Sequence, residues 1–182
     1  MTHDHLPTPD AVPVASLGLD DFETGLLAVM RHFLTAFARP ESQAWQSAYA
    51  GAAERWGEAR GPQVAHGLLA VIQTIRQVRR EDFHYANPMC QSCREQATAE
   101  EAAFCLMIHA MRRDRADLAR GAVLDLTGGK MDPMLIQVAL AFAARFPAAA
   151  GATAAPAAAA PARVSPQIRI DRPAARHLRL VH

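Results

Sequence analysis

The stretch TAEEAAFCLMIHAMRRDRADLARGAVLDLTGG, residues 98–129, decides the fold because it has the pattern of two helices joined by a tight turn. Thr98 and Glu101 have the spacing of a capping box, which marks a helix start. Apolar residues then follow at helical spacing: Phe104, Cys105, Ile108 and Met111. Asp114 or Arg115 is predicted to make the turn. The second helix is predicted to turn Leu118, Ala122 and Val123 inward and to end at Gly128 and Gly129.

The same signals predict further helices on both sides of this pair. Asp20 and Glu23 give another capping box, Pro40 ends the helix that follows, and Pro62 can open a helix at its first position. Segments with helical periodicity lie at 20–37, 45–56, 62–80 and 133–146. Residues 81–97 lack a helical period, and no region rich in strand signals is found. We therefore predict an all-α protein, a compact bundle of about six helices over residues 19–147.

Composition narrows the classes of protein to which the chain can belong. The 182 residues are 51% hydrophobic, and the net charge of +1 gives no argument for nucleic acid or an anionic membrane. We expect neither a membrane span nor a signal peptide, because no apolar run is long enough. Three cysteines do not form the even set of a secreted disulfide framework. A cytoplasmic location is therefore expected, where grouped cysteines bind metal or react.

Both ends of the chain differ in composition from the predicted bundle. Residues 1–18 are polar and Pro-rich, which predicts a flexible arm, and residues 148–162 form an Ala/Pro-rich linker. The tail, residues 163–182, holds five Arg and one Asp beside several aliphatic residues. This mixture predicts a docking motif for an unknown protein partner, although a tail without a role remains an alternative. The predicted partner-binding residues are Arg169, Arg172, Arg176, Leu178, Arg179 and Leu180.

The most specific chemical pattern is Cys90-x2-Cys93-x11-Cys105-x3-His109. Two cysteines separated by two residues can direct both sulfurs to one ion, and residues four apart on a helix share a face. Three thiolates and an imidazole suit a closed, structural zinc site, so Zn²⁺ is the expected cofactor. Alternatively, Cys105 is an ordinary core residue and His109 a surface one, and His84 or Asp125 replaces a missing ligand.

No catalytic motif for nucleotide binding, hydrolase or metalloprotease chemistry is present, so we predict a protein that is not an enzyme. A redox role for the CxxC pair is not favoured, because no strand is predicted before it. The favoured function is a zinc-stabilised helical adaptor or regulatory protein that acts through protein contacts. The alternatives are a thiol or metal sensor and a DNA-binding transcriptional regulator. The last is suggested by a group of arginines around the turn: Arg112, Arg113, Arg115 and Arg120.

Overall fold

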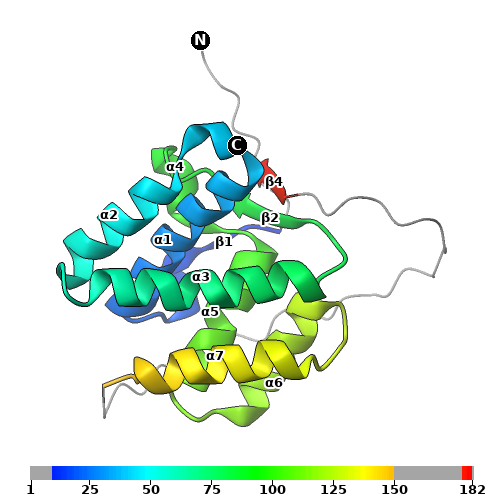
Figure 1. Cartoon of the computed structure of the whole chain (residues 1–182). Helices are drawn as coiled ribbons and strands as arrows, with labels where there is room; N and C mark the ends of the chain where they lie inside the picture. Colours follow the sequence, from blue (N-terminus) through cyan, green and yellow to red (C-terminus); the bar gives the residue numbers. More distant parts are fainter. Residues whose placement is uncertain (1–9, 150–177, 182) are drawn as a thin grey trace.

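The computed structural model describes residues 10–149, and the backbone of residues 178–181. Over these residues the protein is mostly helical, as predicted, with seven α-helices (Figure 1). Six of them match the helices predicted from periodicity: α1 Asp21–Ala38, α2 Trp45–Trp56, α3 Gly61–Val78, α5 Ala99–Met111, α6 Ala116–Thr127 and α7 Pro133–Arg145. The seventh, α4, is a single turn at Gln91–Arg94 that the sequence pattern does not predict.

Four short strands accompany the helices, although the sequence predicts none. Strand β1 (Val12–Pro13) pairs antiparallel with β3 (Gln96–Ala97), and β2 (Phe83–Ala86) pairs in parallel with β4 (Leu178–Val181). Strands of two to four residues are too short to show an alternating pattern, which is why periodicity does not find them. They give structure to part of the predicted N-terminal arm, to the segment 81–97 and to the end of the tail.

Local signals fix most helix ends. Both predicted capping boxes form, at Asp20 with Glu23 and at Thr98 with Glu101. Gly128 adopts φ 66° at the end of α6, a left-handed conformation that favours glycine. Asp114, with φ 54°, lies in the turn between α5 and α6.

The prediction that Leu118 faces inward is wrong, since its side chain is 50% exposed. The buried face of α6 is formed by Ala119, Ala122, Val123 and Leu126. Leu118 precedes this face by one residue, and one residue corresponds to about 100° of rotation around a helix. Ala122 and Val123 are buried, as predicted.

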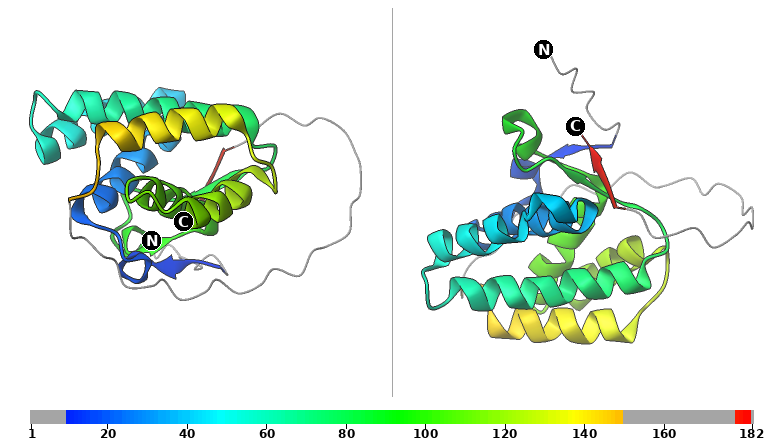
Figure 2. Two further views of the ribbon diagram at one scale, coloured as in Figure 1. Left: turned by 90° about the horizontal axis from the view of Figure 1, so that it is seen from below. Right: turned by 45° about the horizontal axis from the view of Figure 1, so that its top comes forward.

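Helix α5 lies at the centre of the fold, with α6 packed beside it and α1 and α7 in contact with it (Figures 1 and 2). Helices α1, α2, α3 and α7 pack in succession around it. The core contains large side chains from several helices that are at most 2% exposed: Met30, Phe33, Leu68, Phe104, Met107 and Ile108. No helix in the described part of the chain is long and apolar enough to cross a membrane.

A row of charged side chains is buried where α1 packs against α5. Arg31, in the second half of α1, forms a bidentate ion pair with Glu101 near the start of α5, with Nε–Oε1 2.7 Å and Nη2–Oε2 2.9 Å. Their side chains are 3% and 0% exposed. At the other end of the interface Glu23 of α1 contacts His109 of α5 and Arg112, the residue that caps the end of α5. The two helices are therefore held antiparallel by polar contacts at both ends.

We expect Arg31→Met to lower the free energy of unfolding by about 3 kcal/mol or more, because it leaves the Glu101 carboxylate buried without its cation. Urea unfolding followed by circular dichroism measures this. Arg120→Met is the matched control, since Arg120 is exposed on α6, and it should change stability by less than about 0.5 kcal/mol. A loss below about 1 kcal/mol for Arg31→Met would show that the ion pair does not hold α1 to α5.

Candidate functional site

The two cysteines of the CxxC pair lie in the loop that follows β2. Asn87 shapes the turn, because its side-chain Oδ1 accepts the N–H of Met89 (3.0 Å) and its carbonyl accepts the N–H of Cys90 (3.2 Å). The single-turn helix α4 begins directly after Cys90. A strand thus precedes the pair, Cys90 is the N-cap of the helical turn α4, and Cys93 lies within that turn. The argument against a redox role, which was that no strand precedes the pair, therefore does not hold.

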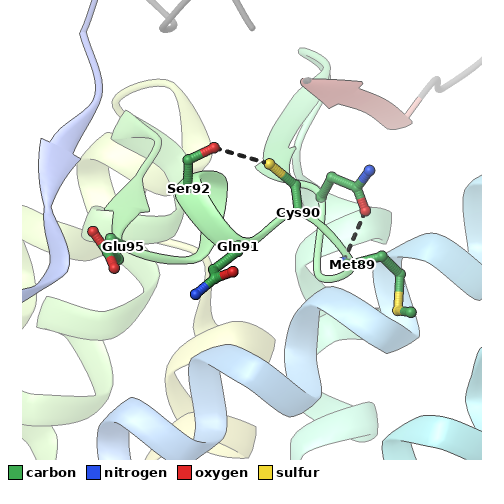
Figure 3. A pocket seen from close by; sticks show the side chains of 6 residues that line it. Met89, Cys90, Gln91, Ser92 and Glu95 are labelled. Carbon is green, nitrogen blue, oxygen red and sulfur yellow. Dashed lines mark hydrogen bonds between the residues drawn. The ribbon is translucent and has the colours of Figure 1, made fainter. Parts of the chain in front are cut away.

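Cys90 and Cys93 form a disulfide, with Cα atoms 5.2 Å apart. The Sγ of Cys90 accepts the N–H of Cys93 at 3.2 Å and lies 3.2 Å from the Ser92 hydroxyl (Figure 3). An N–H directed at this sulfur would stabilise a thiolate after reduction. The geometry therefore places a backbone hydrogen-bond donor at the Sγ of Cys90.

The disulfide borders an open hollow at the surface. Its lining comes from this one loop (Figure 3): Asn87, Met89, Cys90, Gln91, Ser92 and Glu95. Cys90 belongs to this lining, whereas Cys93 does not. Met89 is 82% exposed, which leaves an apolar side chain beside the sulfur in contact with solvent. A small thiol or a peptide chain can therefore approach Cys90 from this side.

The Arg31–Glu101 ion pair also holds both ends of the loop. Before the cysteines, Oε1 of Glu101 accepts the N–H of Ala86 at 3.1 Å. After them, Arg31 donates to the carbonyls of Arg94 (3.2 Å) and Gln96 (2.6 Å). The ends of the loop are consequently tied to two helices, while the two cysteines between them are half-buried.

The structure does not bring Cys105 and His109 to the CxxC pair. Both lie on the same side of α5, as their spacing predicts, but that side packs on α1. Nδ1 of His109 lies 2.9 Å from Oε2 of Glu23. Cys105 is 2% exposed, and burial, with a smaller contribution from the Glu101 carboxylate, raises the pKa of its thiol. Cys105 therefore has the buried position that the alternative reading of the sequence predicted.

The proposed substitute ligands lie elsewhere too. His84 is on β2 with Nδ1 3.4 Å from a carboxylate oxygen of Glu100, and Asp125 is exposed on α6. Among the described residues no three His, Cys, Asp or Glu side chains are placed to hold one metal ion. The predicted set of four zinc ligands is thus not assembled in this structure, and zinc binding stays a prediction.

The predicted partner-binding residues divide into two groups. Arg169, Arg172 and Arg176 lie outside the described residues, as does nearly all of the predicted linker. Leu178, Arg179 and Leu180 form most of β4, in register with Phe83, His84 and Tyr85 of β2. The end of the tail thus lies against the strand that leads to the disulfide. Sequence reasoning missed this contact because it joins segments far apart in the chain.

After full reduction, we expect a thiol reagent at mildly alkaline pH to modify Cys90 and Cys93 quickly and Cys105 slower by on the order of a hundredfold, because Cys105 is reached only through an opening of the fold. A raised pKa acts in the same direction, since less of this thiol is ionised at any given pH. Mass spectrometry of timed samples measures the rates. Equal modification of all three thiols in the folded protein would contradict the assignment of Cys105 to the core.

Comparisons with protein-family models, with characterised proteins and with solved structures find no match for this chain.

Proposed function

We propose that the protein is a thiol-based redox sensor, a regulatory protein that is not an enzyme, in which Cys90 and Cys93 change between disulfide and dithiol. One observation carries the proposal: the two sulfurs are joined in an open loop, whereas the third cysteine is buried and separate from them. Reactive cysteines are the accessible ones, and buried ones are inert. The sensor was an alternative prediction from the sequence, and this geometry favours it over the others.

The reaction is an exchange with a cellular thiol such as glutathione. The thiolate of glutathione attacks Sγ of Cys90, the bond between Cys90 and Cys93 breaks, and Cys93 leaves as a thiolate that takes up a proton. A second glutathione attacks the glutathione sulfur of the mixed disulfide. The products are glutathione disulfide and the protein dithiol, and the reverse sequence oxidises the protein. Cys90 is the sulfur attacked because it lines the open hollow.

A reversible sensor has to stay folded in both states, and the anchoring of the loop supports this. The ends of the loop are held by Arg31 and Glu101, not by the disulfide. A disulfide that closes so short a ring restricts the unfolded chain by only about 2 kcal/mol. Reduction should therefore release the residues between Ala86 and Gln96, α4 included, without unfolding the six longer helices.

The proposed compartment is the cytoplasm, which is the expectation from cysteine usage. Disulfides in reducing compartments are usually transient and serve catalysis or redox sensing. A disulfide of this kind, at the surface and between neighbouring residues, is more accessible to reductants than one in a core. An accessible disulfide that is readily reduced is what a redox sensor in a reducing compartment requires.

DNA binding is less well supported. The Arg112 guanidinium donates to Glu23 (2.5 Å) and Asp20 (2.7 Å), and Arg113 binds the same two carboxylates. Two of the arginines grouped around the turn are thus engaged within the protein. Phosphate contacts need exposed cations, so this group is a poor DNA-binding face.

We expect the wild-type disulfide to reach a reversible equilibrium with mixtures of reduced and oxidised glutathione, and Cys105→Ala to behave identically. Cys93→Ser should accumulate one glutathione on Cys90, because the resolving thiol is missing, and Cys90→Ser should accumulate several-fold less. Intact-mass measurement after acid quenching distinguishes these species. If the disulfide of the folded protein does not react in any of the glutathione mixtures, the sensor proposal is wrong.

Zinc binding by the reduced pair is the second candidate, because both sulfurs lie together on one loop. Two thiolates fill only half of a tetrahedral shell, so we expect clearly less than one zinc per chain in the reduced protein. Metal analysis after anaerobic reduction and dialysis against zinc measures this. Close to one zinc per chain that is lost in Cys90→Ser but kept in Cys105→Ala would instead favour a zinc-binding function.

A further inference from the structure

The two edges of β2 differ in what occupies them. On one edge, the carbonyl of His84 accepts the Thr98 hydroxyl (2.8 Å) and the N–H of Ala86 donates to Glu101 (3.1 Å). Successive residues of a strand direct their backbone groups to alternate edges. Phe83 and Tyr85 therefore direct theirs to the other edge, which β4 occupies. The first edge is closed by the start of α5, and the second is open to any strand that can replace β4.

Strand β4 is suited to replacement. It has four residues, and its only strand partner in the described part of the chain is β2. A two-stranded sheet of this length is marginally stable by itself. It lies more than 90 positions after β2 in the sequence, so its pairing with β2 closes a long stretch of chain, which costs entropy. A peptide segment of similar sequence can therefore compete with β4 when it binds more tightly or when its local concentration is high.

The direction of β4 leads toward the disulfide. The two strands are parallel, and Val181 pairs with Ala86, the last residue of β2 (Figures 1 and 2). The chain then enters the turn from Asn87 to Cys90, which lines the hollow. A bound strand that continues beyond the position of Val181 would follow this turn. A cysteine about three residues further along such a strand, at ~3.3 Å per residue, would lie near Cys90.

We propose that the open edge of β2 is the docking site for the protein partner of the disulfide, and that β4 is its built-in competitor. The partner supplies an extended segment that pairs in parallel with β2 and carries a cysteine shortly after the paired residues. The proposal rests on the proposed redox function and names the class of thiol with which the pair exchanges: a cysteine in an extended peptide segment. The aliphatic and basic sequence LRLV of β4 shows the kind of segment that this edge accepts.

The two thiols of the partner supply the two electrons that reduce the Cys90–Cys93 disulfide. The docked thiolate attacks Sγ of Cys90, the bond to Cys93 breaks, and Cys93 leaves as a thiolate and is protonated. A second cysteine of the partner attacks the partner sulfur of the mixed disulfide. The partner is oxidised to a disulfide, and Cys90 and Cys93 are reduced to thiols. Docking increases the rate of the first attack because it brings the two sulfurs together.

Two peptides test the docking step on the oxidised full-length protein. One has the sequence LRLVGSC, and its control, LPPVGSC, lacks two backbone N–H groups that a strand can donate. The rate at which the Cys90–Cys93 disulfide is reduced is measured by intact mass after acid quenching and alkylation of the free thiols, with glutathione as a reference thiol. We expect LRLVGSC to react on the order of tenfold faster than LPPVGSC, because only the first peptide can make the full set of strand contacts with β2.

A variant of the chain tests competition by β4. The double variant Arg179→Pro with Leu180→Pro removes a backbone N–H donor from β4, whichever of the two residues directs its N–H to β2. It should increase the rate with LRLVGSC and leave the rate with glutathione unchanged. Ala174→Pro with Ala175→Pro, which precedes β4, is the matched control and should behave as wild type. Circular dichroism checks that each variant is folded.

The outcomes separate docking from redox function. If both peptides react equally fast with the variant that lacks β4 pairing, while glutathione still reacts, the docking proposal is overturned and the redox sensor stands. If no thiol reacts with the disulfide, glutathione included, the proposed function fails and the docking proposal fails with it. A preference for LRLVGSC that grows when β4 is displaced supports the proposal.

Discussion

The ion pair between Arg31 and Glu101 is the contact on which the loop and the helical body both depend. The Glu101 carboxylate accepts hydrogen bonds from Nε and Nη2 of Arg31 and from the backbone N–H groups of Ala86 and Thr98. All of these partners are needed, because a buried charge is tolerated only when its hydrogen bonds are satisfied. One carboxylate thus caps the start of α5, accepts the N–H of the last residue of β2 and binds Arg31 of α1. Arg31 also holds the second end of the loop, because it donates to the carbonyls of Arg94 and Gln96.

The same helix pair explains why two predicted metal ligands lie away from the CxxC pair. Cys105 and His109 lie between Glu101 and Arg112 along α5, on the side that faces α1. His109 contacts Glu23, whereas Cys105 packs in the hydrophobic core. Four-residue spacing places residues on one face, but it does not determine whether that face meets a loop, another helix or solvent. Only the packing of α1 on α5 decides this.

The sequence was sufficient for features that depend on neighbouring residues and insufficient for those that depend on distant ones. The six longer helices, both capping boxes and the CxxC pair follow from spacings of two to four residues, and the structure contains them. The partners of Glu101 and His109 could not be predicted, because Arg31 and Glu23 lie 70 and 86 residues away. Strand β2 pairs with residues about 95 positions along the chain, and four residues give too little pattern to reveal it.

The proposed redox change and the proposed strand docking both involve β2, and the ion pair bears on how they would influence each other. Because Glu101 holds the N–H of Ala86 by a contact outside the loop, breaking the disulfide should not change the register of β2. The four positions that pair with β4 therefore stay the same in both states. Any effect of reduction on docking has to arise beyond Ala86, where an incoming segment would meet Asn87, Met89 and Cys90. A partner that stops at the position of Val181 would then bind both states equally, whereas one that extends further would distinguish them.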